Sequence, residues 1–346
     1  REPIGVCALI VPWNFPLLLA AWKLAPALAM GNTVVLKPSP YTSLSLVRFF
    51  ELLHEKADLP PGVVNLVLGG AATGEALVRH RGIDKVAFTG STDTGRRIVH
   101  GAADSNLKAV SLELGGKSPS IFFEDVPDLD FTLARSYDLM FSQKGEKCSE
   151  PTRFLVQGGL YDDFVRRLAE KAATAVCGDP FDPASDQGPQ CNRPQFEKVL
   201  HYIELGRREG ARLRAGGGPD LQGRNAEGLF VRPTIFDEVT PQMRIAREEI
   251  FGPVLCVLRF EDEDEAVELA NASEYGLAAG LYTRDVARAH RVARRLDAGM
   301  VFVNRYGCYD FASPFGGFKQ SGWGKEMAFH SLEAYTRTKS VWVHLA

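Results

Sequence analysis

Residues 4–37 read IGVCALIVPWNFPLLLAAWKLAPALAMGNTVVLK, and their pattern decides the fold class. IGVCALIV at 4–11 has the apolar composition of a buried strand, and TVVLK at the end of the stretch has it again. The segment 16–31 between them is apolar but is interrupted by Lys23 and Pro26, which is typical of a core helix and too broken for a membrane span. Two buried strands joined by a helix predict a βαβ unit with parallel strands.

The same alternation continues to about residue 115. Helices are predicted over about 43–56 and 72–80 and in STDTGRRIVHGAA, and strands in VVNLVLG, KVAFTG and NLKAVSLEL. Apolar strands that alternate with helices indicate an α/β fold, a parallel sheet covered on both faces. Such sheets bind ligands at the carboxyl ends of their strands.

After the two glycines at 115–116 the pattern partly repeats. Strands are predicted in SPSIFF and RFLVQ, and helices over 129–142, 161–176 and 192–209. We therefore expect a second α/β lobe over about 116–315. The terminal KSVWVHLA alternates but has no local partner, so it either pairs with another chain or joins a sheet of its own chain.

The composition is that of an ordinary globular protein. The chain has 346 residues, 45% hydrophobic and 24% charged, with a net charge of −3, which allows roughly two domains and offers no broad basic surface for nucleic acid or an anionic membrane. None of the six cysteines forms a CxxC pair, and no histidine lies at zinc-ligand spacing from them. We expect no metal site, no disulfide framework, and a reducing, cytoplasmic compartment.

The start of the chain is unusual. Arg1 is not an initiator methionine, strand-like sequence follows almost at once, and no signal-peptide pattern is present. We expect a fragment or one part of a longer polypeptide.

Cys148 lies in SQKGEKCSEPTR at 142–153, among charges rather than in an apolar setting. The thiolate is the reactive form of cysteine, and nearby cations increase its fraction. Lys144 and Lys147 flank this cysteine and Gly145 permits a tight backbone, which suits a nucleophile. A half-buried cysteine without a role is the other interpretation.

Polar residues follow several predicted strands. Asn14 in VPWNFPL either donates to an oxyanion or belongs to a loop turn. Glu113 in SLELGGKSP is either a base of raised pKa or an ion-paired surface carboxylate. FTGSTDTGR either holds a phosphate at a helix start or has a plain N-cap at Ser91 or Thr92, and Lys37 in VLKPSP could reach a nucleotide ribose or phosphate.

Taken together, these segments resemble the aldehyde dehydrogenase superfamily. PWNFPL, GNTVVLKPS, KVAFTGST, LELGGKSP, EEIFGPV and SPFGGFKQSGWGKE occur in the family's order and at near-family spacing, over essentially all 346 residues. The resemblance implies a Rossmann-like cofactor-binding domain over 1–115, a catalytic domain over 116–315, and a return to the cofactor domain with an oligomerisation strand over 316–346. Family chains have a substantial segment before the position of Arg1, so the N-terminal part of the cofactor domain is expected to be missing.

The resemblance also implies the chemistry, which is oxidation of an aldehyde to a carboxylic acid with NAD or NADP through a cysteine thiohemiacetal and thioester. Cys148 is implied as the nucleophile, Asn14 as the oxyanion donor and Glu113 as the general base. Lys23 and Glu326 match a proton relay. A homodimer or homotetramer is expected, with a small-molecule aldehyde as substrate and no nucleic acid or membrane partner.

The remaining site residues come from the same alignment. Those implied for the cofactor are Val11, Pro12, Trp13, Lys37, Ser39, Pro40, Gly90, Ser91, Leu114, Gly115, Glu249 and Phe251. Those implied for the substrate pocket are Phe15, Leu19, Trp22, Ser142, Lys147, Ser149, Tyr309 and Phe315. Aromatic and aliphatic walls suit an apolar aldehyde. Ser142, in place of a commonly bulky aromatic, would widen the funnel, whereas Lys147 could favour an acidic substrate tail.

Two departures from the family pattern bear on the chemistry. Lys144 and Glu146 replace the family's two glutamines before the nucleophile, and Glu150 replaces a small residue after it. Lys147 would favour thiolate formation, whereas the two glutamates would oppose it. Pro40 stands where NAD-preferring members carry a glutamate that repels a 2′-phosphate, so we expect tolerance of NADP.

Two alternative functions compete with the leading one. A relative that passes the thioester to coenzyme A is one, although such enzymes generally lack the base that Glu113 matches. A catalytically weak homologue that acts as a scaffold or subunit is the other, motivated by the short start and the altered nucleophile loop.

Overall fold

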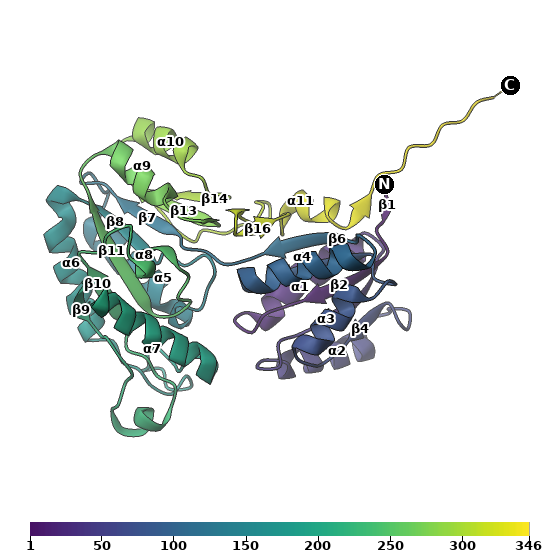
Figure 1. The fold of residues 1–346 in the computed structure, drawn as a ribbon, viewed down its shortest axis with the longest axis horizontal. Helices are drawn as coiled ribbons and strands as arrows, with labels where there is room; N and C mark the ends of the chain where they lie inside the picture. The colour runs from purple at the N-terminus through teal and green to yellow at the C-terminus, as the bar shows by residue number, and fades with distance from the viewer. Residues whose placement is uncertain (346) are drawn as a thin grey trace. The chain divides into compact units, whose positions relative to one another are not determined.

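The computed structural model describes residues 1–345 and divides the chain into two compact units (Figure 1). The first unit contains Arg1–Leu114, Tyr309–Gly316 and the chain from Gly322 onward; the second contains Gly115–Cys308 and Gly317–Ser321. The chain re-enters the first unit at Tyr309 because a bridge between Phe315 and Glu326 holds it there. The pairing of β12 (Tyr275–Gly276) with β15 (Phe318–Lys319) keeps 317–321 in the second unit.

The first unit is built on a six-stranded sheet of order β16-β6-β5-β2-β3-β4. The strands are β2 (Val6–Ile10), β3 (Thr33–Lys37), β4 (Val64–Leu66), β5 (Lys85–Thr89), β6 (Ala109–Glu113) and β16 (Gly322–Trp323). All neighbours are parallel except β16, which runs antiparallel to β6. The chain lays down β2, β3 and β4 in one direction and then crosses to β5 and β6, so the topological switch point lies between β2 and β5.

Helices cover both faces of this sheet, as the alternating pattern predicts. They are α1 (Pro16–Ala29), α2 (Leu44–Lys56), α3 (Ala71–Arg79) and α4 (Thr92–Ser105). Cys7, Leu9 and Val11 pack in one apolar layer with α1 and α2. Ala8 and Ile10, which point the opposite way, pack in a second layer with α3 and α4. The result is a three-layer sandwich with a fully buried β2 at its centre.

The end of the chain adds a small sheet to the first unit. β1 (Glu2–Pro3) pairs antiparallel with β17 (Thr336–Arg337), after α11 (Ala328–Glu333). Residues 338–345 join no strand among the described residues, and Trp342 is 92% exposed. The alternative that this tail adds to a sheet of its own chain is therefore not what the structure has, and pairing with another chain stays a prediction.

The second unit has a seven-stranded sheet of order β14-β13-β7-β8-β11-β10-β9. The strands are β7 (Pro119–Phe122), β8 (Arg153–Gln157), β9 (Arg212–Ala215), β10 (Thr234–Asp237), β11 (Val254–Phe260), β13 (Ala278–Tyr282) and β14 (Met300–Val303). Only β9 runs antiparallel to its neighbour among these strands. One continuous sheet confirms the expected second α/β lobe.

Helices again lie on both faces. They are α5 (Leu129–Phe141), α6 (Gly158–Ala173), α7 (Arg193–Arg208), α8 (Arg244–Arg247), α9 (Glu263–Asn271) and α10 (Val286–Arg295), with 3₁₀ turns at Ser142–Gly145 and Gly223–Glu227. α5 and α6 share one apolar layer, and α7, α9 and α10 share the other. The prediction of a helix over 161–176 was wrong at its start. Glu124 accepts a hydrogen bond from the Gly159 N–H (2.9 Å), which satisfies a free donor and lets α6 begin on two glycines.

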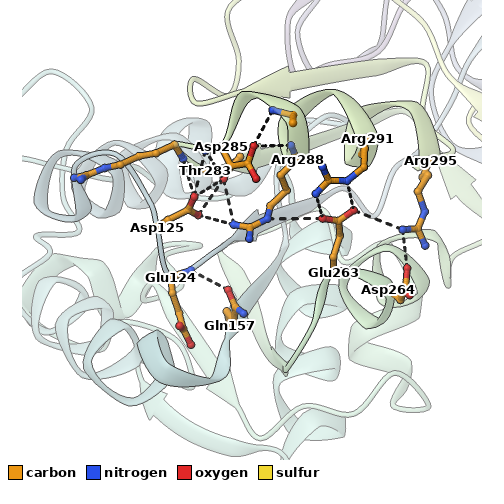
Figure 2. A network of polar contacts seen from close by, with 12 residues as sticks. Glu124, Asp125, Gln157, Glu263, Asp264, Thr283, Asp285, Arg288, Arg291 and Arg295 are labelled. Atoms are coloured by element: carbon orange, nitrogen blue, oxygen red, sulfur yellow. Dashed lines mark hydrogen bonds and ion pairs between the residues drawn. The ribbon is translucent and has the colours of Figure 1, made fainter.

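A network of ion pairs lies at the carboxyl ends of β7 and β13 (Figure 2). Asp125 accepts a hydrogen bond from the Thr283 hydroxyl (2.8 Å) and pairs with the Arg288 guanidinium (2.9 Å). Glu263, at the start of α9, pairs with Arg291 (2.8 Å) and more loosely with Arg288 (3.7 Å). The network ties α9 and α10 to these two strand ends, so this edge of the second sheet is devoted to structural contacts.

Within residues 1–345 no helix combines the length and the apolar character that crossing a bilayer requires.

Candidate active site

The carboxyl ends of the parallel strands gather the predicted cofactor residues of the first unit. Val11 follows β2, Lys37 ends β3, Ser91 follows β5 and Leu114 follows β6. Parallel neighbours end at the same edge of a sheet, so these residues lie along one edge. Asn14 comes after β2 and Ser91 after β5, on the two sides of the switch point.

The start of α4 lies close against the end of β6. Ser91 is the N-cap, and its Oγ accepts a hydrogen bond from the Thr94 N–H (3.3 Å), so the N-cap interpretation is confirmed. A Cβ added at Gly95 would lie 2.7 Å from the Leu114 side chain, which explains why glycine stands in the first turn of the helix. A helix N-terminus at the edge of a parallel sheet suits a phosphate, and that use of Ser91 and Gly90 stays a prediction.

Lys37 is held at the ends of β3 and β4. Its ammonium donates to the carbonyl oxygens of Pro38 (2.8 Å) and Gly69 (2.7 Å), and burial lowers its pKa. Ser39 accepts a hydrogen bond from the Tyr41 N–H (3.3 Å) in the turn that follows, next to Pro40. The lysine predicted to reach a ribose is thus fixed by two backbone carbonyls at this edge of the sheet.

Glu113, the last residue of β6, is buried, with 4% of its surface exposed. Neither carboxylate oxygen has a hydrogen-bond partner among residues 1–345. Burial raises the pKa of this carboxyl well above its ordinary value, and the charge of Glu326 raises it further, while Lys23 and Lys325 oppose the shift. The interpretation as an ion-paired surface glutamate is wrong, because the structure has a buried carboxyl of raised pKa; its role as a base stays a prediction.

Lys23 and Glu326, predicted as a relay, are in direct contact. The Lys23 ammonium is fully buried within α1; it donates to the Thr89 hydroxyl (2.6 Å) and forms a short ion pair with Glu326 Oε1. Glu326 is close enough to Glu113 to affect its pKa. These three side chains therefore form one electrostatically linked group in the first unit.

Sequence reasoning missed three residues around this group: Thr89, Gly316 and Lys325. Gly316 has φ +146°, and a Cβ there would lie 2.5 Å from Glu113 Oε1, so only glycine lets the backbone pass the carboxyl. Lys325 donates to the Gly316 carbonyl (2.6 Å). The only signal for Lys325 was its place beside Glu326 in SGWGKE.

Aromatic side chains form a cluster in the same unit. The rings of Trp22 and Phe315 lie 4.9 Å apart, and those of Tyr309 and Phe315 lie 5.8 Å apart. Leu19 is buried on α1, the helix that also carries Trp22, and Phe15 is the N-cap residue of α1. The five are the first unit's share of the predicted substrate pocket, and their character is apolar.

Cys148 is half-buried and follows a strained turn in the second unit. After α5 ends at Phe141, Gln143 (φ 51°), Lys144 (φ 62°) and Gly145 (φ 69°) are all left-handed. A Cβ at Gly145 would lie 2.2 Å from the carbonyl oxygen of Gly252, so this position requires glycine. Left-handed residues other than glycine are uncommon and cluster at functional sites.

The charges around the cysteine neutralise one another in pairs. Lys144 pairs with Glu146 (3.1 Å) and Lys147 with Glu150 (2.7 Å), and Lys147 also donates to the Ser142 hydroxyl (2.8 Å). Burial lowers the pKa of Lys147 to about 8, an effect that the neighbouring thiol opposes. The expected opposition of the two glutamates to a thiolate is therefore offset by their lysines. An acidic substrate tail would have to compete with Glu150 for Lys147.

Gly115 and Gly116, the two glycines after Glu113, lie close to the Glu249 side chain and to the backbone of Cys148. The Gly116 N–H donates to Glu249 Oε1 (3.0 Å), and burial raises the pKa of that carboxyl. A Cβ at Gly116 would lie 2.3 Å from the Cys148 carbonyl oxygen, and one at Gly115 would lie 2.5 Å from Glu249 Oε2. Phe251, two residues on, has φ 60°. These segments precede β7, β8 and β11, so this half of the site lies at the amino ends of its strands.

The other cysteines and the possible metal ligands were compared with Cys148 over the described residues. All six cysteines are free thiols, and burial raises the pKa of Cys177 to about 11. No group of three or more histidine, cysteine, aspartate or glutamate side chains in residues 1–345 is arranged to hold a metal ion. Ser149, also predicted for the substrate pocket, accepts a hydrogen bond from the Tyr306 hydroxyl (2.9 Å) through its backbone carbonyl.

The folds of the two units define a class: an α/β protein with a dinucleotide-type sheet in one unit and a cysteine on a strained turn in the other. Residues 1–341 match the model of the aldehyde dehydrogenase family. The chain belongs to the aldehyde dehydrogenase family, which confirms the resemblance.

Known relatives are similar over the whole chain. Human retinal dehydrogenase 2 is 48% identical over 346 residues, which cover 100% of this chain and 66% of that protein. The structure of the aldehyde dehydrogenase KauB from Pseudomonas aeruginosa superposes with a TM-score of 0.96 at 45% identity, covering 99% of this chain and 69% of that one. Betaine aldehyde dehydrogenase from Staphylococcus aureus, solved in complex with NAD+, gives 0.94 at 40% identity, covering 96% and 66%. The chain thus spans just under two thirds of the human protein's length.

Proposed function

We propose that the protein oxidises an aldehyde to a carboxylic acid and transfers the hydride to NAD+ or NADP+. The observation that carries the proposal is Glu113, a buried carboxyl of raised pKa without a hydrogen-bond partner among residues 1–345. Hydrolysis of a thioester needs such a base, whereas transfer to coenzyme A does not. Family membership supplies the reaction class, and Glu113 supports its hydrolytic branch.

The residues present fit a dinucleotide. In the first unit, the close-packed start of α4 suits a phosphate, and Lys37, at the ends of β3 and β4, suits a ribose. In the second unit, the Glu249 carboxylate would accept hydrogen bonds from a ribose. The structures of the Staphylococcus aureus relative and of an indole-3-acetaldehyde dehydrogenase contain NAD+. When bound, the nicotinamide supplies the hydride acceptor.

The chain's own residues would then perform the carbon–sulfur chemistry. The Cys148 thiolate attacks the aldehyde carbon, a C–S bond forms, and the carbonyl oxygen becomes an oxyanion. Asn14 and the Cys148 N–H would donate to that oxygen. Once the hydride has left, a thioester remains on the sulfur. Glu113 would take a proton from a water whose oxygen attacks the thioester carbon; the C–S bond then breaks and the thiolate is regenerated.

Lys23 and Glu326 would pass the proton onward from Glu113. Their ion pair is buried, and beyond the effect of burial the charge of Glu326 raises the pKa of Glu113 while that of Lys23 lowers it. The aromatic cluster around Phe315 favours an apolar aldehyde.

We also propose a homodimer or homotetramer in a reducing compartment such as the cytoplasm. The exposed, alternating tail with Trp342 supports self-association through a strand. The six free cysteines support a reducing environment.

Steady-state turnover of several aldehydes with NAD+ and with NADP+ tests the proposal, comparing the parent with Cys148→Ala. The variant should lose about 10³–10⁴-fold in kcat, since it lacks the sulfur that would form the thioester. Cys177→Ala is the matched control, because burial keeps that thiol protonated, and it should retain the parent's turnover. Full activity of Cys148→Ala would exclude the assigned nucleophile, and a parent that turns over no aldehyde would favour a scaffold role.

A further inference from the structure

The nucleophile turn, residues 142–148, has an internal backbone hydrogen bond from the Glu146 N–H to the Gln143 carbonyl (3.0 Å), but it also contains two non-glycine residues of unfavourable backbone conformation. Gln143 and Lys144 are left-handed without being glycine or asparagine. Such conformations persist only where the surroundings fix them. The position of the thiol therefore depends on whatever anchors this turn.

Glu146 is the anchor on one side. Its side chain is completely buried. Oε1 accepts a hydrogen bond from the Cys191 N–H (3.0 Å), and Oε2 pairs with the Lys144 ammonium (3.1 Å). Cys191 directly precedes Asn192, the N-cap of the 16-residue helix α7. The carboxylate thus lies beside the start of α7; burial raises its pKa, and the Lys144 ammonium and the Cys191 N–H oppose that shift.

The same helix fixes the segment on the other side of the turn. Gln195, in the first turn of α7, donates to the carbonyl oxygens of Ile250 (3.1 Å) and Phe251 (2.6 Å). The next residue, Gly252, is the one whose carbonyl oxygen leaves no room for a Cβ at Gly145. The nucleophile turn is therefore wedged between the start of α7 and the loop at 250–252.

We propose that Glu146 is a positioning residue that sets the location of the Cys148 sulfur by clamping the nucleophile turn to α7. It acts through the Lys144 ammonium and the Cys191 backbone and touches neither substrate nor cofactor. In this chain the contact between the two positions is an ion pair. The inference rests on the proposed function of Cys148 as nucleophile.

A double-mutant cycle in the full chain tests the clamp. Glu146→Gln leaves Lys144 without its carboxylate, and Lys144→Gln leaves a buried carboxylate without its ammonium. Each should lower kcat about ten- to a hundredfold with the aldehyde KM within about threefold, because a displaced thiol attacks poorly once substrate is bound. The double variant has a neutral amide pair and should recover to within about threefold of the parent kcat.

Glu150→Gln is the matched control. It also removes a buried carboxylate two residues from Cys148, but it leaves the contact with Cys191 intact. An equal loss of kcat in Glu150→Gln and Glu146→Gln would overturn the proposal, since local charge rather than the clamp would then explain both. So would a double variant no better than the singles, or single variants with kcat within about twofold of the parent.

Amide hydrogen exchange separates this proposal from the proposed function, because it needs no turnover. The Cys191 amide and the nucleophile turn should exchange at least about tenfold faster in each single variant, and as in the parent in the double variant and in Glu150→Gln. A parent without aldehyde turnover but with this exchange pattern would refute the dehydrogenase and keep the clamp. Unchanged exchange in the single variants would refute the clamp, whatever their activity. If the single variants do not fold, the double variant decides: parent-like kcat and exchange would support the clamp, and loss of both would refute it.

Discussion

The two units use opposite ends of their parallel strands. In the first, the candidate residues follow β2, β3, β5 and β6, at the carboxyl ends. In the second, the segments with Gly116, Cys148 and Glu249 precede β7, β8 and β11, at the amino ends, while the carboxyl ends of β7 and β13 carry the ion-pair network of Figure 2. The rule that places α/β sites at carboxyl ends therefore covers the candidate residues of the first sheet but not those of the second.

The charges and helix ends around the candidate residues differ between the two sheets. At the carboxyl ends of the first sheet, helix α4 begins, and its positive end suits an anion. At the amino ends of the second sheet, α5 ends just before the nucleophile turn, and the negative end of a helix disfavours a thiolate. Lys144, Lys147 and the start of α7 supply the compensating positive charge there. A sheet that uses its amino ends thus needs cationic side chains where the other uses a helix dipole.

The largest expected effect tests the base at the carboxyl end of β6. Glu113→Gln keeps the shape of the side chain but cannot accept a proton, so kcat should fall about 10²–10⁴-fold. In the parent, the raised pKa means that Glu113 remains protonated at a pH where an ordinary glutamate is ionised, so kcat should rise with pH as the proton is lost. A kcat–pH profile of both proteins checks this. A variant with kcat within about threefold of the parent would remove Glu113 from the mechanism.

A smaller effect is expected from the amide at the carboxyl end of β2. Asn14→Ala should lower kcat about 10²–10³-fold by removing an oxyanion donor. Asn32→Ala is the control at the opposite end of the same sheet: Asn32 is also buried, precedes β3 and forms hydrogen bonds with Gly5, Ala27 and Tyr335. It should lower stability but not the kcat of the folded protein. Equal kcat losses in the two variants would assign the effect of Asn14 to folding.

Pro40, which follows the end of β3, should affect the choice between NAD+ and NADP+. With Pro40 in place of a carboxylate, the parent KM for NADP+ should lie within about a hundredfold of that for NAD+. Pro40→Glu should raise the ratio of the two KM values about tenfold, because a carboxylate repels the 2′-phosphate. A parent KM for NADP+ beyond that range, or an unchanged ratio in the variant, would contradict this view of Pro40.

The smallest effect on turnover is expected at the carboxyl ends of the second sheet. Arg288→Met breaks the pair with Asp125 and should lower the free energy of unfolding by about 1–2 kcal/mol. Its kcat should stay within about twofold of the parent, since this edge is structural. Arg166→Met, which breaks an exposed pair on α6, should change stability by less than about 0.5 kcal/mol. Denaturant titration measures the stability of both variants, and steady-state kinetics measure their kcat. A tenfold loss of kcat in Arg288→Met would mean that this edge of the sheet contributes to turnover.

Much of the fold was predictable because it depends on local pattern. The continuous apolar runs from Val6 to Ile10 and in the other strands predict both sheets, and the strand-end rule singles out Asn14, Glu113 and Ser91. Of the amino-end residues, Cys148 was marked as a candidate nucleophile by its charged surroundings, whereas Glu249 came only from the family resemblance. Nothing local marks the connection that carries Glu249 as a site.

The contacts that hold the nucleophile turn were beyond sequence reasoning. Lys144 and Glu146 are two residues apart, a spacing that does not bring side chains together on a helix; the left-handed turn does so here. Cys191 lies 45 residues from Glu146, and a hydrogen bond over that separation has no sequence signature. The enclosure of Glu113 by Gly316 and Lys325 escapes prediction for the same reason.

The central claim is that Cys148 and Glu113, at opposite kinds of strand end, serve successive steps of one reaction. Mass spectrometry of the Cys148 peptide from Glu113→Gln, quenched in acid after mixing with aldehyde and NAD+, tests it most directly. The account predicts an acyl group on Cys148 and about one equivalent of reduced cofactor, because the thioester forms but is not hydrolysed. An unmodified Cys148 with full turnover, or an acyl group on another residue, would contradict it.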